Sequence, residues 1–176
     1  MDLTVRDGYQ LGDTIKTYLQ LMKLRIVILL CFTTVTAMVI AADGLPELDT
    51  LLFTLLGGIL ASGGSSAINQ YVDRDMDAKM SRTARRPIPS GRISATNALL
   101  FGIALVVWSV VILTVWVNTL AALMAFMGAI YYVVIYTMIL KRNTVVNILI
   151  GGGAGAFPIL VGWAAVTGTL TFEAGL

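Results

Sequence analysis

The sequence predicts an all-α fold, a polytopic bundle of helices that crosses a membrane about five times. Three observations lead to this prediction. First, 57% of the 176 residues are hydrophobic, only 12% are charged, and the mean hydropathy is +0.86, which is more apolar than a soluble core of this size requires. Second, five apolar runs approach the ~20 residues that a membrane-spanning helix needs. Third, every lysine and arginine lies outside those runs.

The predicted elements follow in order along the chain. Residues 1–22 are polar and of mixed charge, which predicts a cytoplasmic N-terminal arm rather than a cleavable signal peptide. Residues 73–95 form an Asp/Arg-rich connection, in which two prolines and a glycine predict turns after residue 85. The apolar runs, each predicted to be a membrane-spanning helix, are residues 26–42, 51–68, 98–117, 120–140 and 145–166.

The basic residues orient the predicted bundle. They lie in or just after the N-terminal arm, in the connection 73–95, and at Lys141 and Arg142. Because lysine and arginine accumulate on the cytoplasmic side, the N-terminus and the Asp-rich connection are predicted to be cytoplasmic. This topological role accounts for the basic residues without a nucleic-acid surface. We expect an integral membrane protein of a bacterial or archaeal plasma membrane, in preference to the mitochondrial inner membrane.

A periodic group of oxygen-bearing side chains follows the second apolar run. Asn69, Asp73 and Asp77 are spaced four residues apart, so on a helix they share one face, whereas Asp75 lies roughly opposite. Polar groups that continue an apolar helix are costly unless a cation compensates them. Carboxylate and amide oxygens suit Mg²⁺, which usually keeps open positions for phosphate oxygens. The pattern therefore predicts a divalent-metal site at the membrane surface.

Six cationic side chains surround this group in the sequence. Guanidinium groups match the geometry of phosphate, so metal and arginines together predict a site for a diphosphate. Taken alone, however, the arginines favour a simpler explanation over phosphate binding, namely membrane topology with the nearby acids neutralising them as a solvated network. The cationic residues are Arg74, Lys79, Arg82, Arg85, Arg86 and Arg92.

Composition excludes several other chemistries. The chain has no histidine, which excludes a histidine-ligated metal or a Ser/His/Asp hydrolase within these residues, and the single Cys31 cannot form an internal disulfide. A glycine-rich segment near residue 152 follows no strand and has no adjacent lysine, so it is not a nucleotide-binding P-loop. Instead, Gly151 and Gly155 predict a helix-packing contact, and Pro158 predicts a kink.

Two features leave alternatives open. Residues 60–68 are mostly small, which favours close helix packing but equally leaves room for a ligand. Tyr132 and Tyr136 share a helix face near a helix end. Such tyrosines are typical of the membrane-interface belt, and ligand contact is the alternative.

From about Leu21 onward the residues resemble a known family, the UbiA-type intramembrane prenyltransferases. The N-x-x-x-D-x-x-x-D pattern of Asn69, Asp73 and Asp77 matches the first Asp-rich motif of that family. Within the family the chain is similar to the haem branch, the protohaem IX farnesyltransferases, rather than to the quinone branch. The stretches that carry the resemblance are residues 23–27, 69–77, 82–83, 86–93, 136–144, 147–158 and 162–163.

This resemblance implies a fold of nine helices around a cavity that opens toward the cytoplasm, where two Asp-rich motifs hold Mg²⁺ and bind farnesyl diphosphate. It also implies that the farnesyl group is transferred to the vinyl group of protohaem IX (haem B), making haem O for haem-copper oxidases. The chain contains only the first motif, so residues 1–176 are expected to form a single incomplete domain. The implied site residues are Asn69, Asp73 and Asp77 for the metal and Lys23, Arg82, Arg86 and Lys141 for the diphosphate.

Two alternatives to this function stay open. One is another UbiA-type enzyme with an aromatic acceptor, from the quinone or chlorophyll branch. The other is a non-catalytic, truncated membrane subunit, and the sequence fits both a fragment and a truncated relative. With one Asp-rich motif, the 176-residue portion is expected to be inactive alone. The implied partners are farnesyl diphosphate, haem B, the lipid bilayer and membrane proteins of the haem pathway.

Overall fold

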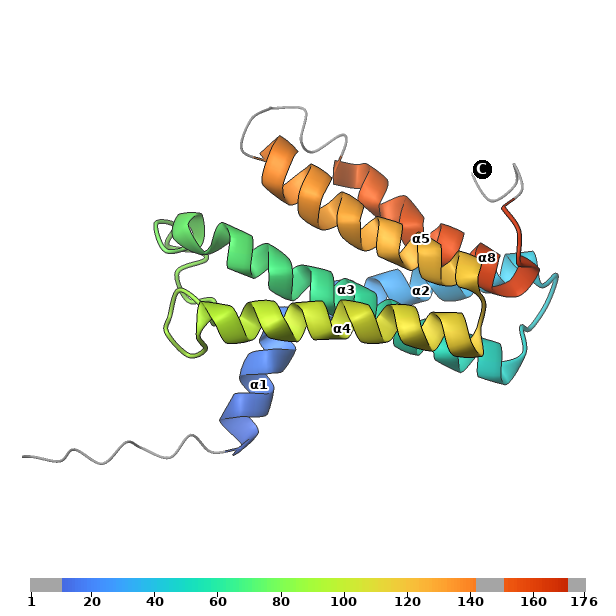
Figure 1. The fold of residues 1–176 in the computed structure, drawn as a ribbon, viewed down its shortest axis with the longest axis horizontal. Coiled ribbons are helices and arrows are strands. Elements are labelled where there is room, and N and C mark those ends of the chain that lie inside the picture. The colour runs from blue at the N-terminus through green and yellow to red at the C-terminus, as the bar shows by residue number, and fades with distance from the viewer. Residues whose placement is uncertain (1–10, 142–150, 171–176) are drawn as a thin grey trace, which may run out of the picture.

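The computed structural model describes residues 11–141 and 151–170, and all its regular elements in these ranges are helices (Figure 1). Polar turns join them, as expected for a bundle with an apolar core and short connections. The helices are α1 (Leu11–Met22), α2 (Leu24–Ala41), α3 (Leu48–Asp77), α4 (Ala95–Trp116), α5 (Thr119–Ile130), the π-helix η1 (Tyr131–Leu140), the 3₁₀-helix η2 (Gly153–Ala156) and α8 (Phe157–Thr167).

Four stretches are long and apolar enough to cross a membrane: α2, α3, α4 and the continuous pair of α5 and η1. They confirm the first four predicted spans. The fifth predicted run, residues 145–166, begins outside the described residues. Its described part contains a shorter apolar stretch, Gly153–Thr167. The outward faces carry large apolar side chains such as Phe32 and Trp108, which are 70% and 60% exposed in the isolated chain and suit contact with lipid.

Successive long helices run back and forth, which brings the basic segments to one end of the bundle. The connection between α3 and α4 and the last turn of η1 lie at one end (Figure 1). Lys23 and Lys141 lie beside the last turns of α3 at that end, because they bond to Asn69 and Asp73. The acidic connection between α2 and α3 lies at the other end. This arrangement agrees with the shared side that the charge pattern predicts for the three basic places.

The pair α3 and α4 is the most closely packed part of the fold. A Cβ atom added to Gly64 would lie 2.6 Å from the carbonyl oxygen of Gly102, and one added to Gly102 would lie 2.8 Å from that of Gly64. Only glycine at both positions permits this backbone contact. A further core forms where α2, α4, α5 and α8 meet, around Met38, Leu113 and Val161. Together these contacts fix α3, the helix that carries the Asp-rich motif.

At the basic end the structure adds a helix within the predicted N-terminal arm and corrects one predicted boundary. The N-terminal arm contains a helix, α1, whose buried residues Leu21 and Met22 pack on the bundle. The helix α3 continues through Asp73 to Asp77, so the connection to α4 comprises residues 78–94 rather than 73–95. It continues because these side chains are buried and paired instead of solvated.

The glycine-rich segment near α8 also differs from its prediction. The backbone tightens into η2 just before Phe157 and Pro158, in agreement with a predicted irregularity at the proline, which lacks an N–H group. Of the helix contact predicted through Gly151 and Gly155, the described residues show the Gly151 half, against η1, but not the Gly155 half. A Cβ at Gly151 would lie 2.5 Å from the ring of Tyr136, whereas one at Gly155 would meet nothing within 4 Å. Gly155 instead leaves space.

Candidate functional site

The Asp-rich motif forms a buried stripe along the last two turns of α3. Asn69, Asp73 and Asp77 are 2%, 0% and 4% exposed, whereas Asp75 on the opposite side is exposed. The four-residue spacing places the three side chains on the inner face, as the helical period predicts. Buried carboxylates require compensating charges or hydrogen bonds, and the surrounding elements provide them.

Asn69 is the centre of a hydrogen-bond network between three elements. Its amide nitrogen donates to Asp73 Oδ2 and to Thr137 Oγ1, both at 3.0 Å, and its carbonyl oxygen accepts from Lys23 Nζ at 3.2 Å. Thr137 in turn donates to the backbone oxygen of Tyr132 at 2.8 Å, a bond across five residues of η1. The π-helical geometry thus turns Thr137 toward α3. These bonds fix the orientation of Asn69, so its carbonyl oxygen faces the cationic side.

Each carboxylate also has a cationic partner. Lys141 Nζ forms an ion pair with Asp73 Oδ2, and Arg86 donates to Asp77 Oδ2 at 2.7 Å. Thr83 secures the turn by donating to the backbone oxygen of Asp77 at 3.1 Å. The second oxygen of Asp73, Oδ1, is buried and has no hydrogen-bond partner within the described residues.

This donor set fits a hard divalent cation. Two carboxylates one helical turn apart and the Asn69 carbonyl supply only oxygen atoms, which Mg²⁺ prefers. The unpaired Asp73 Oδ1 is an anionic acceptor that the described part of the protein leaves without a donor. No group of three histidine, cysteine, aspartate or glutamate side chains comes together in the described ranges. Asn69 and non-protein ligands would therefore have to complete such a site.

A basic cavity of about 240 Å³ opens beside these carboxylates. Its cationic side chains come from the start of α2 and from the connection 78–94, and two glutamines complete the polar wall. Gln70 is held there because its amide donates to the Leu21 carbonyl at 2.9 Å. The arrangement suits a multiply charged anion. The lining residues are Gln20, Lys23, Gln70, Arg82, Arg85, Arg86 and Pro87.

Lys23 combines an unusual backbone with an unusual side-chain environment. It joins α1 to α2 in a left-handed conformation, with φ 52° and ψ 57°, and this turn directs the chain back into the bundle. Burial, followed by the positive charges of Arg86 and Lys141, lowers the pKa of the Lys23 amine to about 8. An incoming anion would therefore meet an amine whose charge is incompletely compensated.

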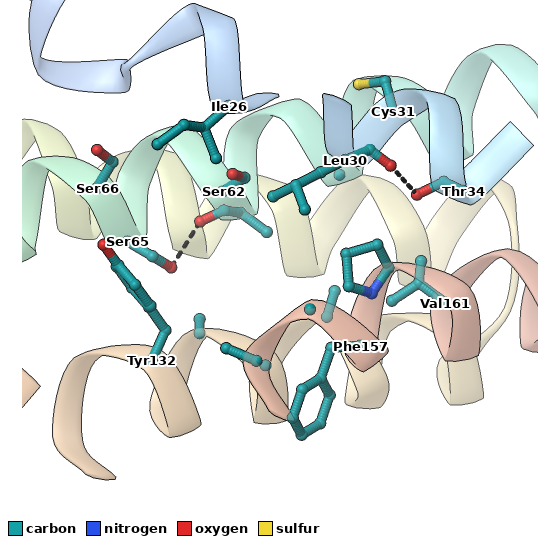
Figure 2. A pocket seen from close by; sticks show the side chains of 18 of the residues that line it. Ile26, Leu30, Cys31, Thr34, Ser62, Ser65, Ser66, Tyr132, Phe157 and Val161 are labelled. Atoms are coloured by element: carbon teal, nitrogen blue, oxygen red, sulfur yellow. Dashed lines mark hydrogen bonds between the residues drawn. The ribbon is translucent and has the colours of Figure 1, made fainter. Parts of the chain in front are cut away.

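A second, apolar cavity of about 270 Å³ extends from Lys23 along the bundle, between α2 and α3 on one side and α5, η1, η2 and α8 on the other (Figure 2). Apolar and small residues form most of its wall, including Ile26, Leu30 and Phe157. Gly58 and Gly155 widen it, since a Cβ at either would meet nothing within 4 Å. Tyr132 lines this cavity, which for this tyrosine favours ligand contact over a place in the interface belt.

The two interpretations of the small residues in α3 apply to different faces of that helix. Gly63 and Gly64 are packing positions, because a Cβ there would lie 2.6 Å from Met22 and from Gly102 respectively. Ser62, Ser65 and Ser66 instead line the apolar cavity. The segment therefore packs on one side and leaves room for a ligand on the other.

The structure brings the metal and diphosphate candidates together around one centre. Lys23, Arg82 and Arg86 share the basic cavity, although Arg82 is exposed, and Lys141 reaches the motif through Asp73. Arg74 lies apart, because its guanidinium stacks on the ring of Tyr71 at 4.4 Å. Arg85, one of the six cationic candidates, also lines the basic cavity. Sequence reasoning missed Gln20, Gln70 and Thr137. Their partners lie on other elements, and no local spacing indicates them.

Comparison with known proteins adds an independent observation. The sequence profile described as the UbiA prenyltransferase family matches residues 30–176, most of the chain. The chain belongs to the UbiA prenyltransferase family. Among solved structures, a UbiA homolog from Archaeoglobus fulgidus bound to DMAPP and Mg²⁺ is similar in fold, with a TM-score of 0.73 and 22% identity over 88% of this chain and 56% of that one.

More similar relatives of this UbiA chain are bacterial. The protoheme IX farnesyltransferase of Roseiflexus sp. (strain RS-1) is 57% identical over 91% of this chain and 30% of that protein. The protoheme IX farnesyltransferase of Nostoc sp. (strain PCC 7120) is 52% identical over 93% of this chain and 52% of that protein. The chain thus spans between about a third and about a half of the length of these curated relatives.

Proposed function

We propose that the complete protein carrying this chain transfers the farnesyl group of farnesyl diphosphate to the vinyl group of haem B, forming haem O. One observation of the structure supports this most directly. Lys23 lines both the basic cavity beside the Asp-rich motif and the apolar cavity within the bundle. A site for a charged head group is therefore continuous with a site for a hydrocarbon tail, as a prenyl diphosphate requires. The choice of haem as acceptor rests on the similar bacterial relatives.

In this proposal the cationic side chains bind the diphosphate and stabilise it as a leaving group. Arg86 and Lys23 come from different elements and face the same cavity, so they hold the head group at a fixed angle to the tail. Arg82 adds charge at the exposed rim. Lys141 lies next to Asp73, close enough to the motif to contribute a further positive charge. Preorganised cations of this kind stabilise charge that develops on the departing oxygen.

Asn69, Asp73 and Asp77 are the proposed residues for Mg²⁺. When bound, the ion would supply Lewis-acid neutralisation of the diphosphate charge. Asp73 is proposed as the principal residue, because its Oδ1 is a buried carboxylate oxygen that has no donor within the described residues. Asn69 holds Asp73 in place through the 3.0 Å hydrogen bond and presents its own carbonyl to the cationic side.

The apolar cavity has a chemical role in this proposal. Breaking the allylic carbon–oxygen bond leaves a carbocation that water would convert to farnesol. Apolar side chains from α2, α3 and α8 surround the tail and keep bulk water from the reacting carbon. The acceptor vinyl group is then the nearest nucleophile. The proposed site is the cytoplasmic end of a membrane bundle.

The function is tested with purified complete protein, haem B, farnesyl diphosphate and Mg²⁺, with haem products identified by mass spectrometry. Formation of haem O is expected. Asp73→Asn or Asp77→Asn should reduce the rate by about 100-fold or more, by analogy with the 10–100-fold losses at residues that only support metal ligands. Asp75→Asn is the matched control, because this exposed carboxylate leaves the inner face unchanged.

Two outcomes would contradict the proposal. Prenylation of an aromatic quinone or chlorophyll precursor, with haem B unchanged, would identify another branch of the family. Absence of any transfer by a folded, membrane-inserted complete protein would favour a non-catalytic subunit.

A further inference from the structure

Hydroxyl groups gather at one end of the apolar cavity, and the proposed function does not yet use them. Ser62, Ser65 and Ser66 on α3 and Tyr132 on η1 all line the cavity. Figure 2 shows the Tyr132 side chain rising from its helix toward the turn of α3 that carries the serines. A hydrocarbon tail offers nothing to which hydroxyls can hydrogen-bond, so a hydroxyl here that has no partner within the protein is unexpected in a site for a prenyl chain alone.

Ser66 is the most informative of the four. Its side chain is buried, with 6% exposure, and its Oγ has no hydrogen-bond partner within the described residues. Serines inside helices commonly donate to the carbonyl four residues earlier, as Ser65 does to Ala61 at 2.7 Å. Because Ser66 makes no such bond, its hydroxyl is available to a molecule in the cavity. A buried hydroxyl without a partner costs free energy, which a bound water or ligand would recover.

The position of Ser66 along α3 places its hydroxyl near the reacting end. Ser66 precedes Asn69 by three residues, a rise of about 4.5 Å along the helix axis. Tyr132 is linked to the same centre, since its backbone oxygen accepts from Thr137, which accepts from Asn69. A water molecule usually needs two to four polar partners to be held in a cavity. Ser62, Ser66 and Tyr132 can supply them at this end.

We propose that Ser66, with Ser62 and Tyr132, holds the water molecule that completes the reaction. This inference rests on the proposed function. There, the terminal vinyl carbon of haem forms a bond to farnesyl C1, while the carbon–oxygen bond to diphosphate breaks and its electron pair leaves with the diphosphate. The positive charge then lies on the vinyl carbon next to the porphyrin ring. The held water adds its oxygen to that carbon, and its proton passes to the departing diphosphate.

Without a held water, the same cation has another outcome. It loses a proton from the neighbouring CH₂ group to the diphosphate and becomes an alkene, a product lighter than haem O by one water molecule. The ratio of alkene to hydroxylated product therefore reports how well water is held. Total turnover does not, because both products follow the same carbon–carbon bond formation.

Ser66→Ala is the direct test, in complete protein with haem B and farnesyl diphosphate. The ratio of alkene to haem O should rise about fivefold, the equivalent of one hydrogen bond to water. Tyr132→Phe keeps the ring and should move the ratio in the same direction, so the proposal stays testable if one variant folds poorly. Thr54→Val is the matched control. Thr54 is also buried in the cavity wall, and its hydroxyl has no partner in the part of the chain that the structure describes. It lies twelve residues, about 18 Å, further along α3.

Each possible result either supports or overturns the proposed water site. A raised ratio in Ser66→Ala and Tyr132→Phe, with Thr54→Val unchanged, supports the proposal. An unchanged ratio in both variants overturns it, even if turnover falls, because that is the effect of a purely structural role. An equal rise in Thr54→Val also overturns it. Failure of the proposed function is recognised separately, since wild-type protein would then form neither haem product.

Discussion

Asp73 has one carboxylate oxygen in an ion pair with Lys141 and the other without a partner among the described residues. The residue is fully buried, so the lysine compensates a charge that would otherwise be very costly to bury. Asp77 has an equivalent partner in Arg86. The protein itself thus supplies a positive charge for each carboxylate of the motif. Lys141 and Arg86 therefore have a structural role besides the proposed one in diphosphate binding.

Removing Lys141 should therefore affect stability as well as activity. Lys141→Met leaves the Asp73 carboxylate buried without its cation, so the free energy of unfolding should fall by about 2 kcal/mol. This loss is smaller than the ~3–5 kcal/mol expected when a fully buried pair is broken, because Lys141 is partly exposed. Thermal unfolding in detergent measures this. The double variant Lys141→Met/Asp73→Asn should recover most of the stability but not the activity. Lys79→Met, on an exposed lysine, is the control, and equal melting of all variants would contradict the prediction.

Among the helices, α3 shows what a sequence pattern can predict. Its apolar run and the four-residue spacing of Asn69, Asp73 and Asp77 together indicated a helix with one polar inner face. The same signals did not indicate α1, whose twelve residues are too few and too polar to resemble a span. Nor did they indicate η1, because a π-helix has the same composition as an α-helix.

The site was predictable only where its residues are neighbours in sequence. The metal candidates could be predicted from their four-residue spacing, whereas the hydrogen bonds that orient them join residues far apart in the sequence. Asn69 and Thr137 are 68 residues apart, and Gln70 and Leu21 are 49 apart. One sequence carries no signal for such pairs, because they depend on how α1, α3 and η1 pack.

The wall that α3 contributes to the apolar cavity should set the length of the accepted prenyl chain. Gly58 lies eight residues from Ser66, about 12 Å further from the head group, and it has open space in front of it. Gly58→Leu should fill the space for the end of a farnesyl chain. The ratio of transfer rates from geranyl and farnesyl diphosphate should then shift toward geranyl by about tenfold.

A control variant separates chain length from a general effect of added bulk. Leu56 lies on an exposed part of α3 and does not line the cavity, so Leu56→Phe should leave the ratio unchanged. If Gly58→Leu lowers the rates of geranyl and farnesyl transfer equally, the cavity wall at this position does not determine the accepted length of the prenyl chain.

In the molecule as a whole, charge and topology agree. The basic segments meet at one end of the bundle, and the acidic connection lies at the other (Figure 1). The apolar outer faces of α2 and α4 lie between these ends, as in a protein that spans a bilayer. The pattern of basic residues predicts which end faces the cytoplasm.

That orientation can be tested by labelling single cysteines in intact cells. Ser90 and Asp49 are both exposed. Asp49 lies in the first turn of α3, and Ser90 lies in the connection that follows the last turn of α3, so they mark opposite ends of that helix. In a Cys31→Ser background, Asp49→Cys should react with a membrane-impermeant reagent added outside, and Ser90→Cys only after the membrane is opened. If both cysteines react from outside, the predicted number of membrane crossings between them is wrong. If only Ser90→Cys reacts from outside, the predicted orientation is reversed.

Lys23 shows that stability and activity can be separated at a single position. A left-handed backbone costs a lysine roughly 1 kcal/mol, and glycine adopts it freely. Lys23→Gly would recover that strain and lose about as much to the greater freedom of the unfolded chain. Removing the amine also removes its hydrogen bond to Asn69 and its repulsion from Arg86 and Lys141, two effects of opposite sign. The melting temperature of Lys23→Gly should thus match that of the wild type, while prenyl transfer falls with the loss of the amine. A screen for thermal stability would therefore accept variants that lack this lysine, whereas a selection for catalytic turnover would retain it.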